Sequence, residues 1–241
     1  MKDEKYKKFA KYYDAIYNRV FYNDYANFVK MIIDEYLFSR VKLLDVACGT
    51  GLFINEVRKK IPNSVVSGFD SSLSMLLIAK KRNKGVIFYN QSFCDFYIKE
   101  KFNVIVSTFD SINYILSQSE LSVFLKNISE HLTDDGLFIF DFNTKFKNPP
   151  QEIRLNNVAM INEIKGKFWH IKISIKDKNK IYNEKHTERL YSKKEMYEAL
   201  KHNGFRNVIF YSDLKGTAEI YNASRLFVVA KKREGSSPSS K

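Results

Sequence analysis

Three carboxylates and a pair of glycines stand where apolar runs of the sequence end. Asp45 ends one such run and precedes Gly49 and Gly51, Asp70 ends VVSGFD, and Asp95 lies in SFCDF. A glycine loop directly after a strand lets the backbone approach a ligand closely. A carboxylate at position 45 would repel a pyrophosphate but would suit a cation or an α-amino group. Asp70 could accept hydrogen bonds from the hydroxyls of a ribose, and Asp95 could accept one from an exocyclic amine such as that of adenine.

The same residues separate two classes of nucleotide ligand. The dinucleotide fingerprint G-x-G-x-x-G needs a third glycine, and Ile54 occupies that place. Three acids around a sugar, a base and a positive centre favour an adenosine that carries a sulfonium and no phosphate. A nicotinamide oxidoreductase is the least favoured enzyme class.

Apolar runs that alternate with helical patterns must position these residues. Strands are expected at 41–47, 64–70, 85–90, 102–108, 136–142, 207–212 and 224–232, and helices at 51–61, 71–82, 118–132 and 193–205. Such alternation predicts an α/β fold whose mostly parallel sheet is covered on both faces. The carboxyl ends of its strands meet at one edge, where ligands of open α/β sheets bind.

Two segments depart from the alternation, and they divide the chain. Residues 1–40 are helical in period, with Phe9, Tyr13, Ile16 and Val20 expected on one buried face, and form an N-terminal cap. Three consecutive strand patterns within 145–191 predict an inserted antiparallel β lid over the ligand edge. The ligand-binding domain is then 41–144 together with 192–232, and 233–241 reads as a disordered polar tail.

Composition bounds the partners of the chain. Its 241 residues carry 40 basic and 27 acidic side chains, a formal charge of +13. The excess is mostly lysine in a sequence also rich in Asn, Ile, Tyr and Phe, which favours a compositional bias over a nucleic-acid patch. Cys48 and Cys94 fit neither a disulfide framework nor a metal site. Without a signal peptide or an apolar span, a cytoplasmic protein with no membrane partner is expected.

The segments LLDVACGTG, VVSGFDSS, QSFCDF and FNVIVSTFDSINYIL resemble the class I S-adenosylmethionine-dependent methyltransferases. Ala47 stands where that family often has glycine. The chain is most similar to small free-standing bacterial enzymes, including sugar-amine N-methyltransferases, which share a Tyr-Asp-x-x-Tyr element like YDAIY at 13–17 and the inserted strands. The resemblance covers 10–143 and the closing helix and strands. It implies a Rossmann-like seven-stranded sheet, S-adenosylmethionine as cofactor, no metal, and methyl transfer to a small-molecule acceptor that carries an amine.

The resemblance also implies roles for single residues. Asp45 would contact the methionine amino group, Asp70 the ribose hydroxyls, and Asp95 the adenine amine. Thr108 and Phe109 would flank the sulfonium. The full cofactor-binding set is Asp45, Ala47, Gly49, Thr50, Gly51, Asp70, Ser71, Met75, Cys94, Asp95, Phe96, Thr108 and Phe109.

Catalytic and substrate residues are expected on the lid and the cap. His186 is the candidate general base, with Glu184 and Glu188 on the same strand face, and Tyr13 is a second catalytic candidate. The expected substrate contacts are Tyr17, Asn113, Tyr114, Trp169 and Arg189, with Arg225 as a further clamp for an anionic group.

Two alternatives remain open: a nucleic-acid methyltransferase that uses a basic lid, and a non-catalytic adenosine-binding module. The loop FDSINY lacks the Asn/Asp-Pro-Pro-Tyr/Phe pattern typical of enzymes that methylate base amines. A binding module would show no open acceptor pocket.

Overall fold

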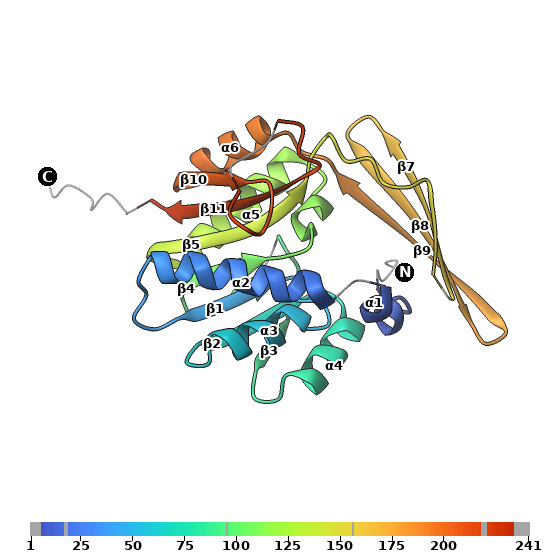
Figure 1. The fold of residues 1–241 in the computed structure, drawn as a ribbon, viewed down its shortest axis with the longest axis horizontal. Coiled ribbons are helices and arrows are strands. Elements are labelled where there is room, and N and C mark those ends of the chain that lie inside the picture. Colours follow the sequence, from blue (N-terminus) through green and yellow to red (C-terminus); the bar gives the residue numbers. More distant parts are fainter. Residues whose placement is uncertain (1–5, 17–18, 95, 156, 218–220, 234–241) are drawn as a thin grey trace, which may run out of the picture.

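A seven-stranded sheet forms the centre of the molecule (Figure 1). The computed structural model describes residues 6–16, 19–94, 96–155, 157–217 and 221–233. In spatial order the strands are β10 (Phe205–Tyr211), β11 (Arg225–Lys232), β5 (Leu132–Asn143), β4 (Phe102–Ser107), β1 (Lys42–Val46), β2 (Val65–Asp70) and β3 (Ile87–Asn90). β11 is antiparallel to both of its neighbours, β10 and β5, and the other pairs in the sheet are parallel. The chain order reverses between β1 and β4, which is where open α/β sheets bind ligands. The predicted fold class is confirmed.

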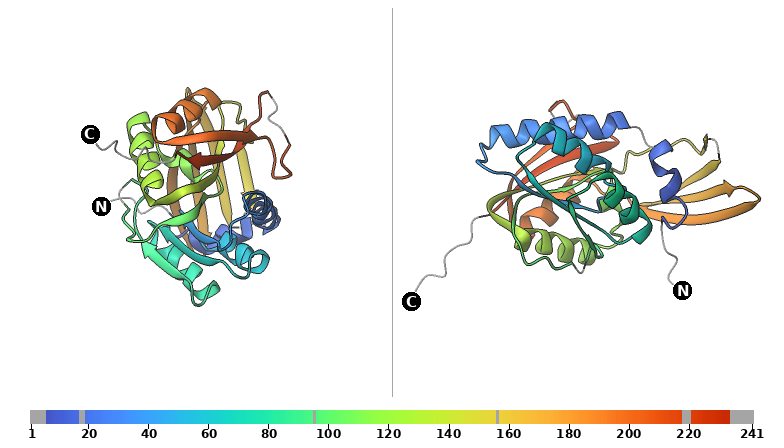
Figure 2. Two further views of the ribbon diagram at one scale, coloured as in Figure 1. Left: turned by 90° about the vertical axis from the view of Figure 1, so that its left-hand side faces the viewer. Right: turned by 90° about the horizontal axis from the view of Figure 1, so that it is seen from below.

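Helices cover both faces of this sheet, because its central strands are apolar on both sides. Leu43 packs with α2 (Arg19–Glu35), α3 (Leu52–Lys60) and α4 (Leu73–Arg82), whereas the next residue, Leu44, packs with α5 (Gln118–His131) and α6 (Lys193–His202). Figure 2 shows α2 and α5 on opposite sides of the sheet. Ser72 caps α4 by accepting the Met75 N–H at 3.4 Å, as its serine-rich start predicts.

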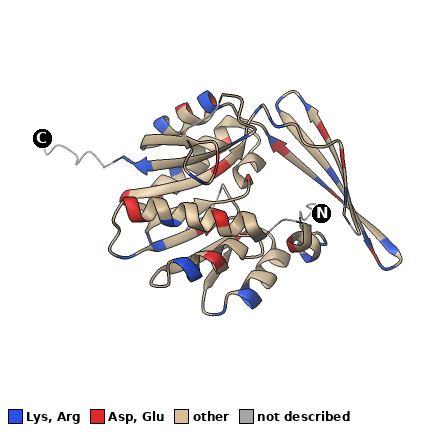
Figure 3. Cartoon of the chain, in the orientation of Figure 1, with Lys and Arg blue, Asp and Glu red and all other residues tan. Residues whose placement is uncertain are grey.

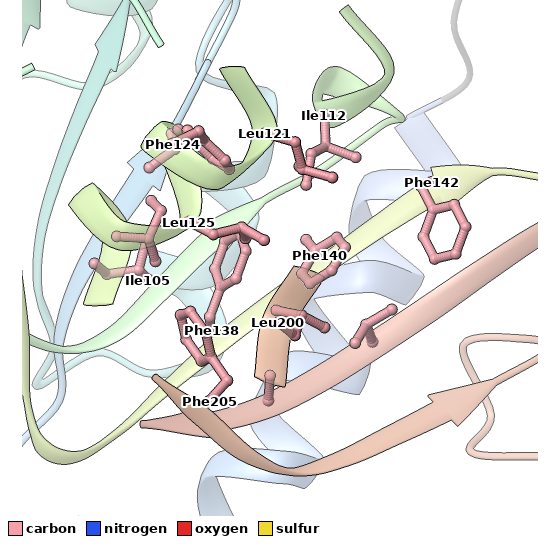
Figure 4. Close-up of a cluster of buried hydrophobic side chains, with 14 of the residues drawn as sticks. Ile105, Ile112, Leu121, Phe124, Leu125, Phe138, Phe140, Phe142, Leu200 and Phe205 are labelled. Carbon is pink, nitrogen blue, oxygen red and sulfur yellow. The ribbon is translucent and has the colours of Figure 1, made fainter. Parts of the chain in front are cut away.

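The core beneath α5 and α6 combines aromatic and aliphatic side chains (Figure 4). Phe138 and Phe140 of β5 stack at 4.5 Å between ring centroids and meet Phe124 of α5 and Leu200 of α6. All four side chains are fully buried. Burying a phenylalanine or leucine stabilises a fold by roughly 1.5–3 kcal/mol, so this cluster holds β5 firmly where it carries the buried carboxylate of Asp141 towards the ligand edge.

A second, antiparallel sheet projects from the carboxyl edge of the first (Figure 1). It consists of β6 (Glu152–Leu155), β7 (Val158–Lys165), β8 (Phe168–Asp177) and β9 (Lys180–Arg189), paired in that order. The alternation of Ile171, Ile173 and Ile175 with exposed residues gives it one apolar face. We call this sheet the lid. The sequence predicted three of its strands and missed the short β6.

The N-terminal segment, residues 6–16 with the helix α1 (Ala10–Ile16), lies against the apolar face of the lid. Phe9 is 1% exposed and packs on the lid isoleucines. Glu184 of β9 accepts the backbone N–H groups of Tyr6, Lys8 and Phe9 at 2.9, 2.9 and 3.0 Å. The expectation that Val20 shares the buried face of Phe9 was wrong, because Val20 belongs to α2, separate from α1, and is 57% exposed.

Within the described residues, no helix is long and apolar enough to cross a bilayer. The tail expected to be disordered lies, from residue 234 onward, outside the described residues.

The position of Ile54 has a packing explanation. A Cβ added to Gly68 of β2 would lie 2.8 Å from Ile54 Cδ1 and 3.1 Å from Cys48 Cβ. Close approach of helix and strand is thus provided by a glycine on the strand, so α3 can carry a large side chain where a dinucleotide fold requires glycine.

We therefore expect Gly68→Ala to destabilise the protein by about 1–3 kcal/mol through overpacking. Ile54→Val, which removes Cδ1, should cost about 0.5–1.5 kcal/mol alone, and the double variant should lose less than the sum. Urea unfolding of the four proteins measures this coupling. Additivity within about 0.5 kcal/mol would show that the two side chains do not compete for the same space.

Candidate active site

A small cavity opens at the carboxyl ends of β1 and β2. We call it the donor cavity; its volume is about 140 Å³. Its lining comes from the glycine loop, the end of β2, the start of α4, the loops after β3 and β4, and the N-terminal segment: Tyr6, Tyr13, Ala47, Gly49, Asp70, Ser71, Met75, Phe93, Phe109, Ser111 and Tyr114.

Asp70 organises the glycine loop. Its carboxylate accepts the Gly49 N–H at 2.9 Å and the Ser72 N–H at 2.8 Å. Gly49 has a φ of 51°, and no atom lies within 4 Å of a Cβ placed there, so the loop borders open space. Ala47 also has a positive φ, of 58°. A left-handed conformation favours glycine, which gives a physical reason for the glycine usual at this place in the family that the sequence resembles.

Asp45 is the most unusual group of this region. It is fully buried, and neither of its carboxylate oxygens has a hydrogen-bond partner among the described residues. Burial, and then the charge of Asp70, raise its pKa well above the ordinary value. It is not among the residues that line the donor cavity. A buried carboxylate without a partner is costly unless a cation or a donor compensates it.

These features fit S-adenosylmethionine. The ammonium of the cofactor would supply the missing partner of Asp45, directly or through water. Asp70, which is 9% exposed, would accept hydrogen bonds from the ribose hydroxyls of the cofactor, and Met75 would contact the adenine of the cofactor. Asp95, which is expected to bind the adenine amine, follows β3 in the sequence but falls outside the described residues.

A second cavity, of about 510 Å³, lies between the lid and the main sheet. We call it the acceptor cavity. It shares four aromatic side chains with the donor cavity: Tyr6, Tyr13, Phe109 and Tyr114. Its other walls include Trp169 and His186 of the lid, and its volume lies within the roughly 300–1,000 Å³ usual for small-molecule sites. The two cavities therefore meet at one aromatic wall.

A chain of hydrogen bonds runs along this wall. The Tyr6 and Tyr114 hydroxyls are 2.6 Å apart, and the Tyr114 hydroxyl is 2.7 Å from His186 Nδ1. His186 Nε2 is 3.4 Å from Glu184 Oε2. Although burial opposes it, the bonds from His186 and from the N-terminal amides lower the pKa of Glu184, so this carboxyl is ionised. This series of hydrogen bonds joins the N-terminal segment, the loop after β4 and the lid.

Charged side chains gather on another part of the acceptor cavity. Arg225 of β11 donates to Asp141 at 2.5 Å and to Asp110 at 2.9 Å. Asp141 also accepts the N–H groups of Phe109 and Asp110 at 2.7 and 2.9 Å. Both of these residues have positive φ, 60° and 51°, so Asp141 holds a strained loop in place. Glu188 lies in the same cluster and lines the cavity at 4% exposure.

Half of the expected site residues line one of these cavities. Ala47, Gly49, Asp70, Ser71, Met75 and Phe109 line the donor cavity, and Tyr13, Tyr114, Trp169 and His186 line the acceptor cavity. Gly51 starts α3 with a φ of 72°. A Cβ there would lie 2.5 Å from Asn83 Nδ2, so this glycine serves close packing on α4.

Thr50 is buried, but its hydroxyl donates to Asp14 of α1 at 2.6 Å. Asp14 also pairs with Arg82 of α4. The aspartate of the YDAIY element therefore attaches the cap to the glycine loop.

Two expected substrate contacts have structural roles instead. The Asn113 amide nitrogen donates to the carbonyls of Asn143 and Arg189 at 2.9 and 2.6 Å, and its oxygen accepts the Asn143 N–H. Arg189 donates to the Leu116 carbonyl at 3.2 Å and to Glu195 at 3.1 Å. Neither residue lines the acceptor cavity. Both residues attach the end of β9 to the loop after β4.

Three expected cofactor contacts also lie off the donor cavity. Phe96 is buried in the core against Phe69, Thr108 is buried, and half-buried Cys94 lies on a separate surface hollow. Phe93 lines the cavity in their place. Tyr17, like Asp95, falls outside the described residues.

Sequence reasoning missed several site residues. Tyr6 has no local signal, because its place at both cavities depends on its contact with the distant lid. Asp110 and Lys147 lie in the loops that follow β4 and β5, and the rule that ligands bind at strand ends could have indicated both.

Comparison with known proteins agrees with this geometry. A family model described as a methyltransferase domain matches residues 43–136. The dTDP-3-amino-3,6-dideoxy-alpha-D-glucopyranose N,N-dimethyltransferase of Streptomyces fradiae is 31% identical over 99 residues, 41% of this chain and 38% of that protein. The aligned segments span 59%, 38% and 60% of the lengths of the first three relatives.

Solved structures match over nearly the whole chain. An S-adenosylmethionine-dependent methyltransferase from Clostridium acetobutylicum is 26% identical, with a TM-score of 0.80 over 95% of this chain and 99% of that one. CalS10, an amino pentose methyltransferase from Micromonospora echinaspora with S-adenosylmethionine bound, shares the fold at 18% identity and a TM-score of 0.73, over 91% and 96% of the two chains. Residues 43–136 thus match a methyltransferase domain, and the chain as a whole is similar in sequence and fold to the class I S-adenosylmethionine-dependent methyltransferases, with sugar-amine methyltransferases among its relatives.

Proposed function

We propose that this protein transfers a methyl group from S-adenosylmethionine to an amine nitrogen of a small molecule, such as an amino sugar, held in the acceptor cavity. The observation that carries the proposal is the aromatic wall of Tyr6, Tyr13, Phe109 and Tyr114, which belongs to both cavities. Methyl transfer needs donor and acceptor in line and water excluded, and two adjoining pockets lined by the same aromatic side chains would hold donor and acceptor next to each other.

The lining of the acceptor cavity supports an amine. Its aromatic faces can stabilise a cation, and its carboxylates Asp110 and Glu188 favour a positively charged or hydrogen-donating group. Names of relatives point the same way, since the Streptomyces fradiae enzyme is named for an amino sugar. When bound, the cofactor supplies a methyl group on a sulfonium, an electrophile with an excellent leaving group. The protein's own residues then have to orient the nitrogen, exclude water and accept one proton.

Two other functions have less support. A non-catalytic adenosine-binding module has no use for a 510 Å³ cavity beside the donor cavity. A nucleic-acid methyltransferase would use basic residues gathered along a strand-binding surface. Figure 3 shows Lys and Arg spread over helices, β11 and the lid, with Asp and Glu among them.

Asp70→Asn should weaken binding of S-adenosylhomocysteine by roughly 10- to 100-fold, because it removes a charged acceptor from the ribose site. Asp34→Asn on the exposed surface of α2 is the matched control and should bind normally. Titration calorimetry measures both. Unchanged affinity of the Asp70 variant, or stabilisation of the wild type by NAD alone, would contradict the cofactor assignment.

Asp45 should make cofactor binding depend on pH. Its carboxyl is protonated below its raised pKa, and only the ionised form pairs with the cofactor ammonium. Affinity for S-adenosylhomocysteine should therefore rise with pH, by at most about tenfold per unit, until Asp45 is ionised in the free protein. Calorimetry between about pH 5.5 and 8.5 tests this. Asp45→Asn should bind more weakly and lose this dependence, and an identical pH profile in both proteins would refute the pairing.

The acceptor class can be tested with labelled S-adenosylmethionine. We expect transfer to amino sugars, free or nucleotide-linked, and none to matched sugars that carry a hydroxyl in place of the amine. Single-stranded and duplex oligonucleotides form the comparison set, assayed at two salt concentrations. Methylated oligonucleotide at rates that fall steeply with salt would replace the small-molecule proposal with the nucleic-acid alternative.

A further inference from the structure

The proposed amine chemistry requires a proton acceptor, because an ammonium has no lone pair with which to attack. His186 was the candidate from sequence, but both of its ring nitrogens are engaged. Ionised Glu184 can only accept, which places a proton on His186 Nε2. His186 Nδ1 then accepts from the Tyr114 hydroxyl. A proton could reach the ring only if the hydroxyl of Tyr114, and with it that of Tyr6, reversed its direction.

Glu188 is engaged through only one of its two oxygens. It lies two residues along β9 on the same strand face, lines the acceptor cavity and is 4% exposed. Its Oε2 is 3.5 Å from the Asn143 amide nitrogen, a long contact, and its Oε1 makes no hydrogen bond among the described residues. The same Asn143 amide also bonds Asp110, next to Phe109 of the shared wall. Glu188 is therefore an under-satisfied carboxylate close to the place where the two cavities meet.

The charges around Glu188 do not balance. It faces Asp110 from the loop after β4, Lys147 from the loop after β5, and Arg225 from β11. Asp141 of β5 belongs to the same cluster through Arg225. Three carboxylates thus accompany two cations, and the cluster is one positive charge short when all five are ionised.

Either a proton on Glu188 or a bound cation would correct this imbalance. Burial, and then repulsion by Asp110, raise the pKa of Glu188 well above its ordinary value. Burial, and then repulsion by Arg225, lower the pKa of Lys147. Both shifts have the direction expected for charges that lack full compensation.

We propose that Glu188 is the general base of the reaction, a step that rests on the proposed amine methylation. The acceptor enters as R–NH₃⁺, whose charge completes the cluster. One proton moves from nitrogen to Glu188 Oε1, which leaves R–NH₂ beside a neutral carboxylic acid. The nitrogen lone pair then forms the new bond to the methyl carbon, and the electrons of the broken sulfur–carbon bond remain on sulfur. His186 is a positioning residue that holds Tyr114 and Tyr6 in the shared wall.

The protonation of Glu188 can be measured without any acceptor. Protein labelled with ¹³C at the glutamate carboxyl carbon, and saturated with S-adenosylhomocysteine, is titrated by NMR. The Glu188 signal is identified by its loss in Glu188→Gln. We expect its midpoint well above the ordinary glutamate value of about 4.3. A Glu188 that titrates at or below the ordinary value would overturn the proposal, whether or not any amine is methylated.

Kinetics then separate Glu188 from His186. With the amine that turns over fastest in the acceptor panel, Glu188→Gln should lower kcat by about 10²- to 10⁴-fold with little change in KM. Its rate should rise only at the higher pH at which the free amine loses its own proton. In His186→Asn, kcat should rise with pH over the same range as in the wild type. Glu163→Gln, on the exposed lid surface, should match the wild type throughout.

Three results would contradict Glu188 as the base. They are an unchanged rise of kcat with pH in Glu188→Gln, the loss of that rise in His186→Asn, and a change in Glu188→Gln that is confined to KM. Glu188→Asp guards against misfolding of the glutamine variant, because it keeps a carboxylate and should retain more kcat than Glu188→Gln. Retained binding of S-adenosylhomocysteine verifies the fold in each case. A panel in which no amine reacts would refute the proposed function, and with it the role of Glu188 as base, whereas a Glu188 that titrates at its ordinary value in a protein that methylates amines would refute that role alone.

Discussion

Buried carboxylates at one edge of a sheet are the constraint on which this structure depends. Asp45, Asp70, Asp110, Asp141 and Glu188 all lie there, and each is nine-tenths buried or more. Asp70 is compensated mainly by backbone N–H groups, and Asp110 and Asp141 by Arg225. Asp45 and Glu188 have no comparable partner, and Glu188 lines the acceptor cavity. The protein thus leaves a negative charge unmatched where each substrate would bring a positive one.

The N-terminal segment connects the two halves of this site. Asp14 fastens it to the glycine loop and α4, and Glu184 fastens it to the lid. Its side chains Tyr6 and Tyr13 form half of the wall common to both cavities. With these residues in place the donor cavity is only about 140 Å³, below the usual range for a small-molecule site.

The sequence predicted the main sheet, its helices and the lid because the spacing of apolar residues and the acids at strand ends are local signals. Asp45, Gly49 and Asp70 follow from the same rule, since parallel strands bring their ends together. Asn113 and Arg189 were expected to contact substrate because polar residues in a loop and a lid suggest ligand contacts, whereas in the structure these two side chains donate to buried backbone carbonyls. Nothing local distinguishes Glu188 from other lid acids. Its importance arises from a charge cluster assembled from four separate parts of the chain.

The central claim is that unmatched carboxylates mark the cationic parts of donor and acceptor. A crystal structure of the complex with S-adenosylhomocysteine tests it most directly. We expect the cofactor ammonium to lie within about 3 Å of Asp45, or to be joined to it by one water, with the sulfur facing the wall of Tyr6, Tyr13, Phe109 and Tyr114. An ammonium far from Asp45, or a sulfur turned away from that wall, would contradict the account.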